Sequence, residues 1–447
     1  MSTTSSATAL PNALPNALPG ALQNDPPNAL PIAERVPLLD VLHGFALLGI
    51  LIMNMPGFSY SGAHEADGSH YWPAAYDQLA EQVRDALYSG KFNSLFSLLF
   101  GLGFTIQYAR MQQTDPLIAN RQYLRRLLVL LVFGVIHACV FWDGDVLHIY
   151  AVLGIELLFG LRRVSDRTLV WIMAGCLVYP LISSLLRVAF VTKEFTASEV
   201  AMWKGIAVRQ DIAFGQGSFI DAAAEHTRMM LLSYTEPYQL WNVFGWYVSM
   251  TLTMLIGVLA GRRLWAQRAE ELMPQIRRLT WIALGVGLSC AAAFTVIFEM
   301  NRVPGPSLIK VLGGLCYNVS RPALMIFYVL LITQLFFRPA LKSLFGPVFS
   351  MMAAAGRMPL TNYLMQTAVC TLLFKAWGFG CWAQVGPAAG FALSLAIFFV
   401  IQVQWSFWWL ARHDRGPIEA LWSRFTYGRR ASASAANVPV PAPAPSS

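Results

Sequence analysis

A histidine and two aspartates close together in the sequence have the side chains needed for proton transfer. His137 lies in an apolar segment shortly before Asp143 and Asp145. Acyl transfer to a hydroxyl or amine needs a general base, and a neighbouring carboxylate orients such a histidine and stabilises its protonated form. Asp143 or Asp145 could supply that carboxylate, and His148 is a second candidate base. Alternatively, the aspartates only form a tight turn around Gly144, and His137 bonds to a neighbouring helix.

A second set of polar side chains lies inside the apolar segment 36–58. At about 100° per residue, Asn54 lies about 20° from His43 and Asp40 about 60° from it, so the three share one helix face. Polar groups inside a membrane span are costly and usually face a protein interior or a wet cavity. We therefore expect Asp40 and His43 to bind substrate and the Asn54 amide to stabilise an oxyanion. Hydrogen bonding between helices is the structural alternative.

Three further residues are predicted to bind substrate. Arg357 and Asn362 begin a later apolar segment, and Arg357 could bind phosphates of a nucleotide-like donor, although a cytoplasmic surplus of basic residues explains it equally well. Arg321 precedes Pro322 inside an apolar stretch longer than one span needs, so it either lies at the interface beside a broken helix or faces a cavity. The sequence has no HExxH or other metal-ligand spacing, so we expect no metal.

Membrane-spanning helices must position these residues. Of the 447 residues, 56% are hydrophobic and 13% are charged, and a soluble chain is about 25% charged. Apolar runs of about 17–25 residues predict about ten spans. They lie near residues 37–57, 92–109, 127–142, 146–161, 168–191, 240–260, 279–300, 310–337, 358–376 and 388–411.

The expected fold is therefore an all-α polytopic transmembrane bundle. It occupies residues 36–430, with segments 58–91 and 192–239 on the outer side. The Pro-rich tails 1–35 and 431–447 are expected to be disordered. Arg residues cluster in alternate loops, which predicts that both termini are cytoplasmic. The net charge of +8 thus reflects membrane topology, and we expect no nucleic-acid partner.

Five sequence blocks carry a family resemblance. They are LDVLHGFALLGILIMNMPGF (39–58), KFNSLFSLLFGLGF (91–104), RRLLVLLVFGVIHACVFWDGDVLHIYAVLGIELL (125–158), GRMPLTNYLMQT (356–367) and GPIEALWSRFTYG (416–428). In this order they resemble the YeiB-like family of bacterial inner-membrane proteins. That family is similar in turn to transmembrane acyltransferases, including the lysosomal enzyme that carries acetyl groups from cytoplasmic acetyl-CoA to glucosamine ends. The chain departs at His43, where family members usually have Arg, which weakens that position as an anchor for an anionic group.

The resemblance implies acyl transfer in the bacterial inner membrane with acyl-CoA as donor. In this hypothesis the thioester enters from the cytoplasm near Asp40, His43 and Arg357. An envelope glycan or lipid acceptor meets it from outside, with His137 as base. The rival class is a secondary transporter or small-molecule channel, which polar residues on several spans and a broken helix would suit equally well. A third possibility is a structural protein whose polar groups only hold helices together.

Overall fold

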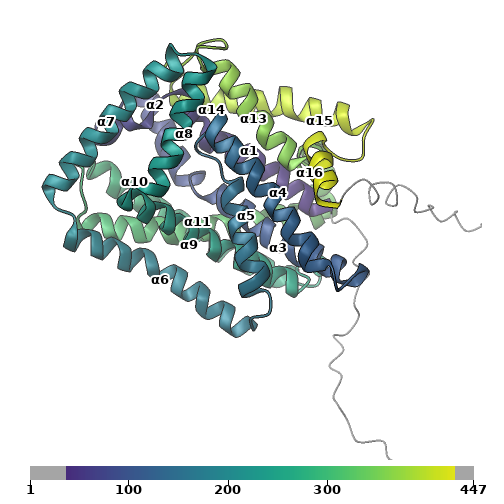
Figure 1. Ribbon diagram of the computed structural model, residues 1–447. Coiled ribbons are helices and arrows are strands. Elements are labelled where there is room, and N and C mark those ends of the chain that lie inside the picture. Colours follow the sequence, from purple (N-terminus) through teal and green to yellow (C-terminus); the bar gives the residue numbers. More distant parts are fainter. Residues whose placement is uncertain (1–36, 428–447) are drawn as a thin grey trace, which may run out of the picture. The chain divides into compact units, whose positions relative to one another are not determined.

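The computed structural model describes residues 37–427, and every regular element in this range is helical (Figure 1). Both predicted tails, 1–35 and 431–447, lie outside the described residues. The α-helices are α1 (Pro37–Ser59), α2 (Ala75–Leu87), α3 (Lys91–Thr114), α4 (Ala119–Val140), α5 (Leu147–Glu156), α6 (Asp166–Phe190), α7 (Lys193–Gly215), α8 (Phe219–Thr235), α9 (Pro237–Arg262), α10 (Met273–Met300), α11 (Leu308–Phe337), α12 (Pro339–Gly356), α13 (Pro359–Phe374), α14 (Pro387–Ala396), α15 (Val403–Leu410) and α16 (Pro417–Tyr427). Three shorter elements complete the list: a 3-10 helix η1 (Gly62–Asp67) and two π-helical segments, η2 (Leu157–Leu161) and η3 (Ile397–Gln402).

Seven helical segments in the described range are long and apolar enough to cross a membrane. They are α1, α4, α6, α9, α10, α11 and the continuous run α14–η3–α15. This confirms the prediction of an all-α polytopic membrane protein. The chain is also helical at the three other predicted spans, in α3, α5 with η2, and α13. The number of ten spans and the cytoplasmic termini stay predictions.

Helix α1 packs against α3, α12, α13 and α14. At its crossing with α12 the two backbones touch. A methyl group added at Gly44 would lie 1.9 Å from the Met352 carbonyl oxygen, and one at Gly356 would lie 1.8 Å from the Asp40 carbonyl oxygen. Small residues at such crossings are typical of membrane helix interfaces, where close backbone packing replaces the hydrophobic driving force.

Residues 338–357 were assigned to no span by the sequence interpretation, which left them between the spans 310–337 and 358–376. They form α12, with Pro339 in the first turn, a position that suits proline because its missing N–H would be unpaired there anyway. A second proline, Pro347, lies inside the helix. Proline within an apolar helix is tolerated where neighbouring helices satisfy the freed backbone groups.

The suggested break at Ser320–Pro322 is also not present. Helix α11 runs through Pro322 without interruption from Leu308 to Phe337. Arg321 is therefore fixed on a regular helix and is only 6% exposed. Lys91 is fully buried at the start of α3 and donates to the Asp85 carbonyl (2.8 Å).

The two long segments predicted on the outer side are helical too. Segment 58–91 contains η1 and α2, and segment 192–239 forms α7, α8 and the start of α9. The Thr192 hydroxyl caps α7 by accepting from the Phe195 N–H, and Ser218 and Asp221 form a reciprocal capping box at α8. Helix α8 contacts both α4 and α9, so it covers the end of α4 that precedes Asp143 and Asp145.

Candidate functional site

The Asp145 carboxylate is the centre of a buried polar cluster. One oxygen is 2.8 Å from His137 Nδ1 and the other is 2.8 Å from His148 Nδ1. The His148 backbone N–H donates to the second oxygen as well (3.1 Å). Asp145 is 1%, His137 4% and His148 6% exposed. Of the two aspartates predicted as partners of His137, the structure therefore pairs Asp145 with it.

Local backbone geometry explains why these side chains meet. Helix α4 ends at Val140, and the turn 141–146 reverses the chain into α5. Gly134 lies one turn before His137, and a methyl group there would approach the His148 backbone nitrogen to 2.2 Å. Because Gly134 lets α4 and α5 touch, His137 on α4 and His148 on α5 both reach the carboxylate in the turn between them.

The outer nitrogens of the two imidazoles bond to hydroxyl groups from other helices. His137 Nε2 is 2.9 Å from Thr367 Oγ1 on α13, and His148 Nε2 is 2.7 Å from the Tyr234 hydroxyl on α8. If each Nδ1–H donates to Asp145, each Nε2 is left as a proton acceptor. A hydroxyl, an imidazole and a carboxylate in this order form the arrangement that supports general base catalysis.

Electrostatics favour an ionised Asp145. Burial alone would raise the pKa of its carboxyl, but the hydrogen bonds from His137 and His148 outweigh burial and hold the pKa below its usual range. An ionised carboxylate can stabilise a positive charge that forms on either imidazole. The cluster is therefore able to accept a proton during a reaction.

Asp143 belongs to a separate pair. Its carboxylate is 2.6 Å from His226 Nδ1 on α8. Burial is the largest effect on the His226 imidazole and lowers its pKa, while Asp143 opposes the shift. Lys375 lies nearby, 1% exposed, with its ammonium 3.3 Å from the Phe214 ring centre and 4.1 Å from that of Trp382. No hydrogen-bond partner for this ammonium is found among the described residues.

A cavity of about 640 Å³ lies among α1, α3, α6, α9 and α11. Arg321 and Arg187 both line it, and none of its described lining residues is acidic. The Arg321 guanidinium stacks on Tyr317, and its buried Nε has no hydrogen-bond partner among described residues. The buried Asn93 Oδ1 is unpartnered as well. A buried guanidinium without a carboxylate is costly, so the chemistry of this cavity fits an anionic group.

The cavity and the Asp145 cluster are neighbours. The Tyr150 hydroxyl donates to the Asn93 carbonyl (3.0 Å) and lies within electrostatic reach of both Asp145 and Arg321. On the other side, Tyr234, the partner of His148, shares a hydrogen bond with Tyr247. Tyr247 directly follows Trp246, which lines the cavity. The Asp145 cluster and the cationic cavity are thus linked through Tyr150 and Asn93.

The residues predicted to bind the acyl donor are Asp40 and His43 near the start of α1 and Arg357 just after α12. His43 Nδ1 is 2.7 Å from the Leu39 carbonyl in its own helix. Arg357 follows the last residue of α12, Gly356, which packs against the Asp40 backbone, so the structure brings Asp40 and Arg357 together. The Arg357 Nε is buried and unpartnered among described residues.

Asn362 is part of a buried amide network. Its side-chain amide donates to the Ala355 carbonyl (2.8 Å) and to the Ser406 hydroxyl (3.0 Å), and its backbone carbonyl accepts from Gln402 (2.7 Å). Gln402 is also hydrogen-bonded to Gln366 (3.1 Å). These contacts join α12, α13, η3 and α15, so Asn362 mainly fixes helix packing, although its Oδ1 has no partner among described residues.

Asn54 is half-buried on α1, and the structure records no hydrogen bond between it and another described residue. It shares a face of α1 with Phe58, whose ring is 4.5 Å from that of Trp142. The Trp142 ring is in turn 6.4 Å from the ring of His137. The face of α1 that carries Asn54 and Phe58 is therefore the one on which Phe58 meets Trp142, the neighbour of His137.

Several residues of the site were missed by sequence reasoning. Thr367, Tyr234 and Tyr247 are single hydroxyl residues in helices far along the chain from the histidines they serve. His226 and Tyr234 lie in the segment 192–239, which was predicted only to be on the outer side. Among the residues that sequence reasoning missed, Lys375 is the one whose sequence context could have indicated a functional site, because it is a lone cation between the apolar stretches 359–374 and 387–410.

The fold and the site define a polytopic membrane protein with a buried histidine–carboxylate cluster beside a cationic cavity. Residues 260–429 match the family described as "Protein of unknown function (DUF418)". Uncharacterized protein YxaH of Bacillus subtilis (strain 168) is 30% identical over 408 residues, which cover 88% of this chain and 94% of that protein. The chain therefore belongs to the YeiB-like, DUF418-containing family.

Two more relatives are similar over nearly their whole length. Uncharacterized protein YeiB of Escherichia coli (strain K12) is 26% identical over 416 residues, covering 88% of this chain and 96% of YeiB. An uncharacterized 39.9 kDa protein in the amylase 3' region of Bacillus acidopullulyticus is 27% identical over 404 residues, covering 90% and 96%. No solved structure matches the chain.

Proposed function

We propose that the protein is a transmembrane acyltransferase of the bacterial inner membrane. It would move an acyl group, such as acetyl, from cytoplasmic acyl-CoA to an envelope glycan or lipid. The observation that carries this proposal is the Asp145 carboxylate holding two imidazoles near a cavity that Arg187 and Arg321 line without any described acidic residue. A positioned base and a binding cavity for an anionic substrate are what such a transfer requires.

In this proposal His148 is the general base, and His137 is the second imidazole on the same carboxylate. The His148 Nε2 bonds to the Tyr234 hydroxyl, which also contacts Tyr247 on α9, a helix that lines the cavity. His137 Nε2 is instead closed off by Thr367, which is 2% exposed. An acceptor hydroxyl or amine that replaces the Tyr234 hydroxyl would give its proton to His148.

The reaction then proceeds in two steps. The acceptor oxygen or nitrogen attacks the thioester carbonyl carbon while its proton passes to His148 Nε2, and the carbonyl oxygen becomes an oxyanion near the Asn54 amide. The C–S bond then breaks, and the CoA thiolate leaves with the proton from His148. Asp40 at the start of α1 and Arg357 just after α12 would hold the acyl-CoA donor, and Arg321 would hold an anionic part of the acceptor.

Label transfer from radioactive acetyl-CoA to fractionated envelope lipids and glycans tests the proposal. Purified wild-type protein in nanodiscs should transfer label, and His148→Gln should abolish the transfer. Arg321→Gln should raise the KM for the acceptor. His413→Gln is the matched control, because His413 is exposed and stacks only on Trp409. Equal transfer by the wild type and His148→Gln would exclude His148 as the base.

A transporter gives a different result in the same system. In proteoliposomes it would move substrate across the bilayer without covalent labelling. Flux without label transfer would therefore replace the enzyme proposal by the transporter class.

A further inference from the structure

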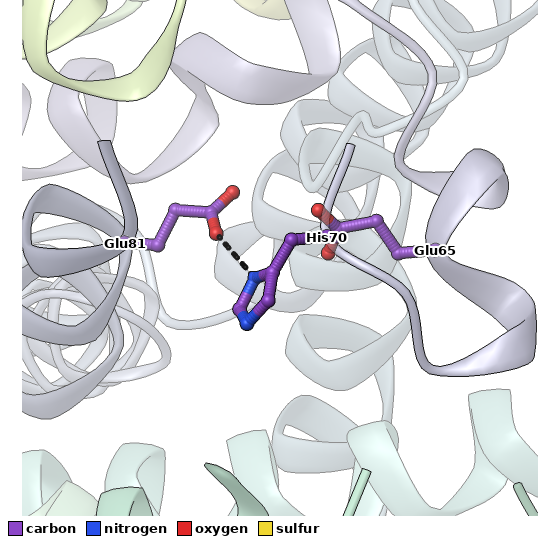
Figure 2. Close-up of side chains that lie close together, drawn as sticks. All are labelled: Glu65, His70 and Glu81. Atoms are coloured by element: carbon purple, nitrogen blue, oxygen red, sulfur yellow. Dashed lines mark ion pairs between the residues drawn. The ribbon is translucent and has the colours of Figure 1, made fainter. Parts of the chain in front are cut away.

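A second group of ligand-type side chains lies in the segment predicted on the outer side. It consists of Glu65 in η1, His70 in the loop after it, and Glu81 on α2, whose side chains converge in Figure 2. One ligand atom from each residue lies within 4.8 Å of the other two. His70 Nδ1 and a Glu81 carboxylate oxygen are 3.8 Å apart. None of these residues takes part in the Asp145 cluster.

The His70 ring is oriented as a metal ligand would be. Its Nε2 is 2.9 Å from a Glu299 carboxylate oxygen on α10. Its Nδ1 is buried and has no hydrogen-bond partner among the described residues. Histidines that bind metals commonly donate their other ring N–H to a carboxylate, which fixes the tautomer and turns the free lone pair toward the ion. Here that free nitrogen lies 3.8 Å from a Glu81 carboxylate oxygen, and Glu65 belongs to the same cluster.

The two carboxylates are held in place but only partly neutralised. Glu81, with a side chain 9% exposed, accepts from the Tyr60 hydroxyl (3.0 Å) through one oxygen. Glu65 accepts from the Tyr71 backbone N–H (3.0 Å). The two carboxylates lie close to each other in this partly buried segment, so a cation between them would relieve the repulsion of like charges.

We propose that Glu65, His70 and Glu81 bind one divalent transition-metal ion. One imidazole and two carboxylates are a borderline ligand set that suits Zn²⁺ and its first-row neighbours. The three residues border a cavity of about 260 Å³, which leaves room for a water molecule or a substrate oxygen as a further ligand. Arg302 is 3.5 Å from Glu65 and 3.4 Å from Glu299, so it can keep the second ion pair when Glu65 turns to the metal.

Such an ion would tie separate elements together. It would link η1 and the following loop to α2, and through Glu299 to the end of α10. The competing explanation is a protonated His70 that bridges the carboxylates without any metal. The two explanations differ in whether the protein binds an ion in a fixed ratio.

The test uses the full chain purified in detergent through a tag without histidines and freed of metal with EDTA. Titration with Zn²⁺ should give one equivalent bound to the wild type, and Co²⁺ should give the visible absorption of a protein-bound ion. We expect His70→Gln and Glu81→Gln each to weaken Zn²⁺ binding at least tenfold and to abolish the Co²⁺ signal. The matched control is Asp67→Asn, because Asp67 lies in the same segment but pairs with Lys204 (2.8 Å).

Thermal unfolding keeps the result interpretable if a variant is less stable. Zn²⁺ should raise the Tm of the wild type and of Asp67→Asn, and should leave the Tm of Glu81→Gln unchanged. No stoichiometric binding to the wild type would overturn the proposal and support the bridging protonated histidine. Equal binding by the wild type and both cluster variants would overturn it as well, because the ion would then bind elsewhere.

Discussion

Replacing Asp145 by Asn tests the centre of the candidate site. The side chain keeps its size but loses its charge and offers an N–H₂ group to one of the two imidazoles. Two charge-assisted hydrogen bonds at 2.8 Å depend on this carboxylate, and each contributes about 1.5–3 kcal/mol. Because the amide oxygen can still accept one of them, we expect the free energy of unfolding to fall by about 2–3 kcal/mol.

The effect on the proposed transfer should be larger than the effect on stability. Asn in place of Asp in a hydroxyl–imidazole–carboxylate triad lowers turnover about 10⁴-fold in a well-studied protease, because the imidazole adopts the wrong tautomer. We expect a loss of about 100-fold or more in label transfer from acetyl-CoA. Chemical unfolding in detergent and the transfer assay measure the two effects on the same preparation.

Asp166→Asn is the control for this substitution. Asp166 pairs with Arg262 (2.8 Å) at the start of α6 and is 41% exposed. A surface ion pair contributes about 0–1 kcal/mol, so this variant should be nearly as stable and as active as the wild type. If Asp145→Asn behaved like Asp166→Asn in both assays, the carboxylate would have no central role and the reasoning would fail.

Two further predictions address the surroundings of the cluster. Burial holds the pKa of His226 below its ordinary value of 6.5, so the unfolded chain takes up a proton that the native state rejects, and the free energy of unfolding should fall as the pH drops below about 6.5. In His226→Gln this fall between pH 7 and 5, measured by thermal unfolding, should be smaller. An unchanged slope in the variant would assign the pH dependence to other groups. Gly134→Ala places a methyl 2.2 Å from the His148 backbone nitrogen and should cost about 1–3 kcal/mol by forcing α4 and α5 apart. Its control is Gly175→Ala in α6, where an added methyl meets nothing within 4 Å and should be neutral or slightly stabilising. Equal unfolding midpoints for the two variants would contradict the close contact between Gly134 and the His148 backbone.

The sequence indicated the local part of the site and missed the distant part. His137, Asp145 and His148 are close along the chain, so helix periodicity and a turn were enough to suggest that they meet. Their partners Thr367 and Tyr234 are separated from them by 230 and 86 positions. Only the tertiary packing of α13 and α8 against α4 brings those hydroxyls within reach, and helix periodicity carries no information about it.

The prediction for α1 shows a second limit. Periodicity correctly placed Asp40, His43 and Asn54 along an apolar helix, but it treated them as one functional stripe. The Asp40 backbone lies at the crossing with α12, a helix that the sequence interpretation did not include. His43 turns back to the Leu39 carbonyl of its own helix. Side chains at one angle of a helix wheel meet different neighbours when those neighbours cross at an angle.

The geometry also bears on the choice between enzyme and transporter. Alternating access needs elements that change their contacts, and broken helices at the membrane midplane often supply them. Helix α11 is continuous through Pro322, and each imidazole on Asp145 is held at both ring nitrogens by bonds of 2.7–2.9 Å. Side chains fixed in this way are preorganised for a reaction, where small displacements are costly. These fixed contacts therefore support the enzyme that we propose over the transporter class.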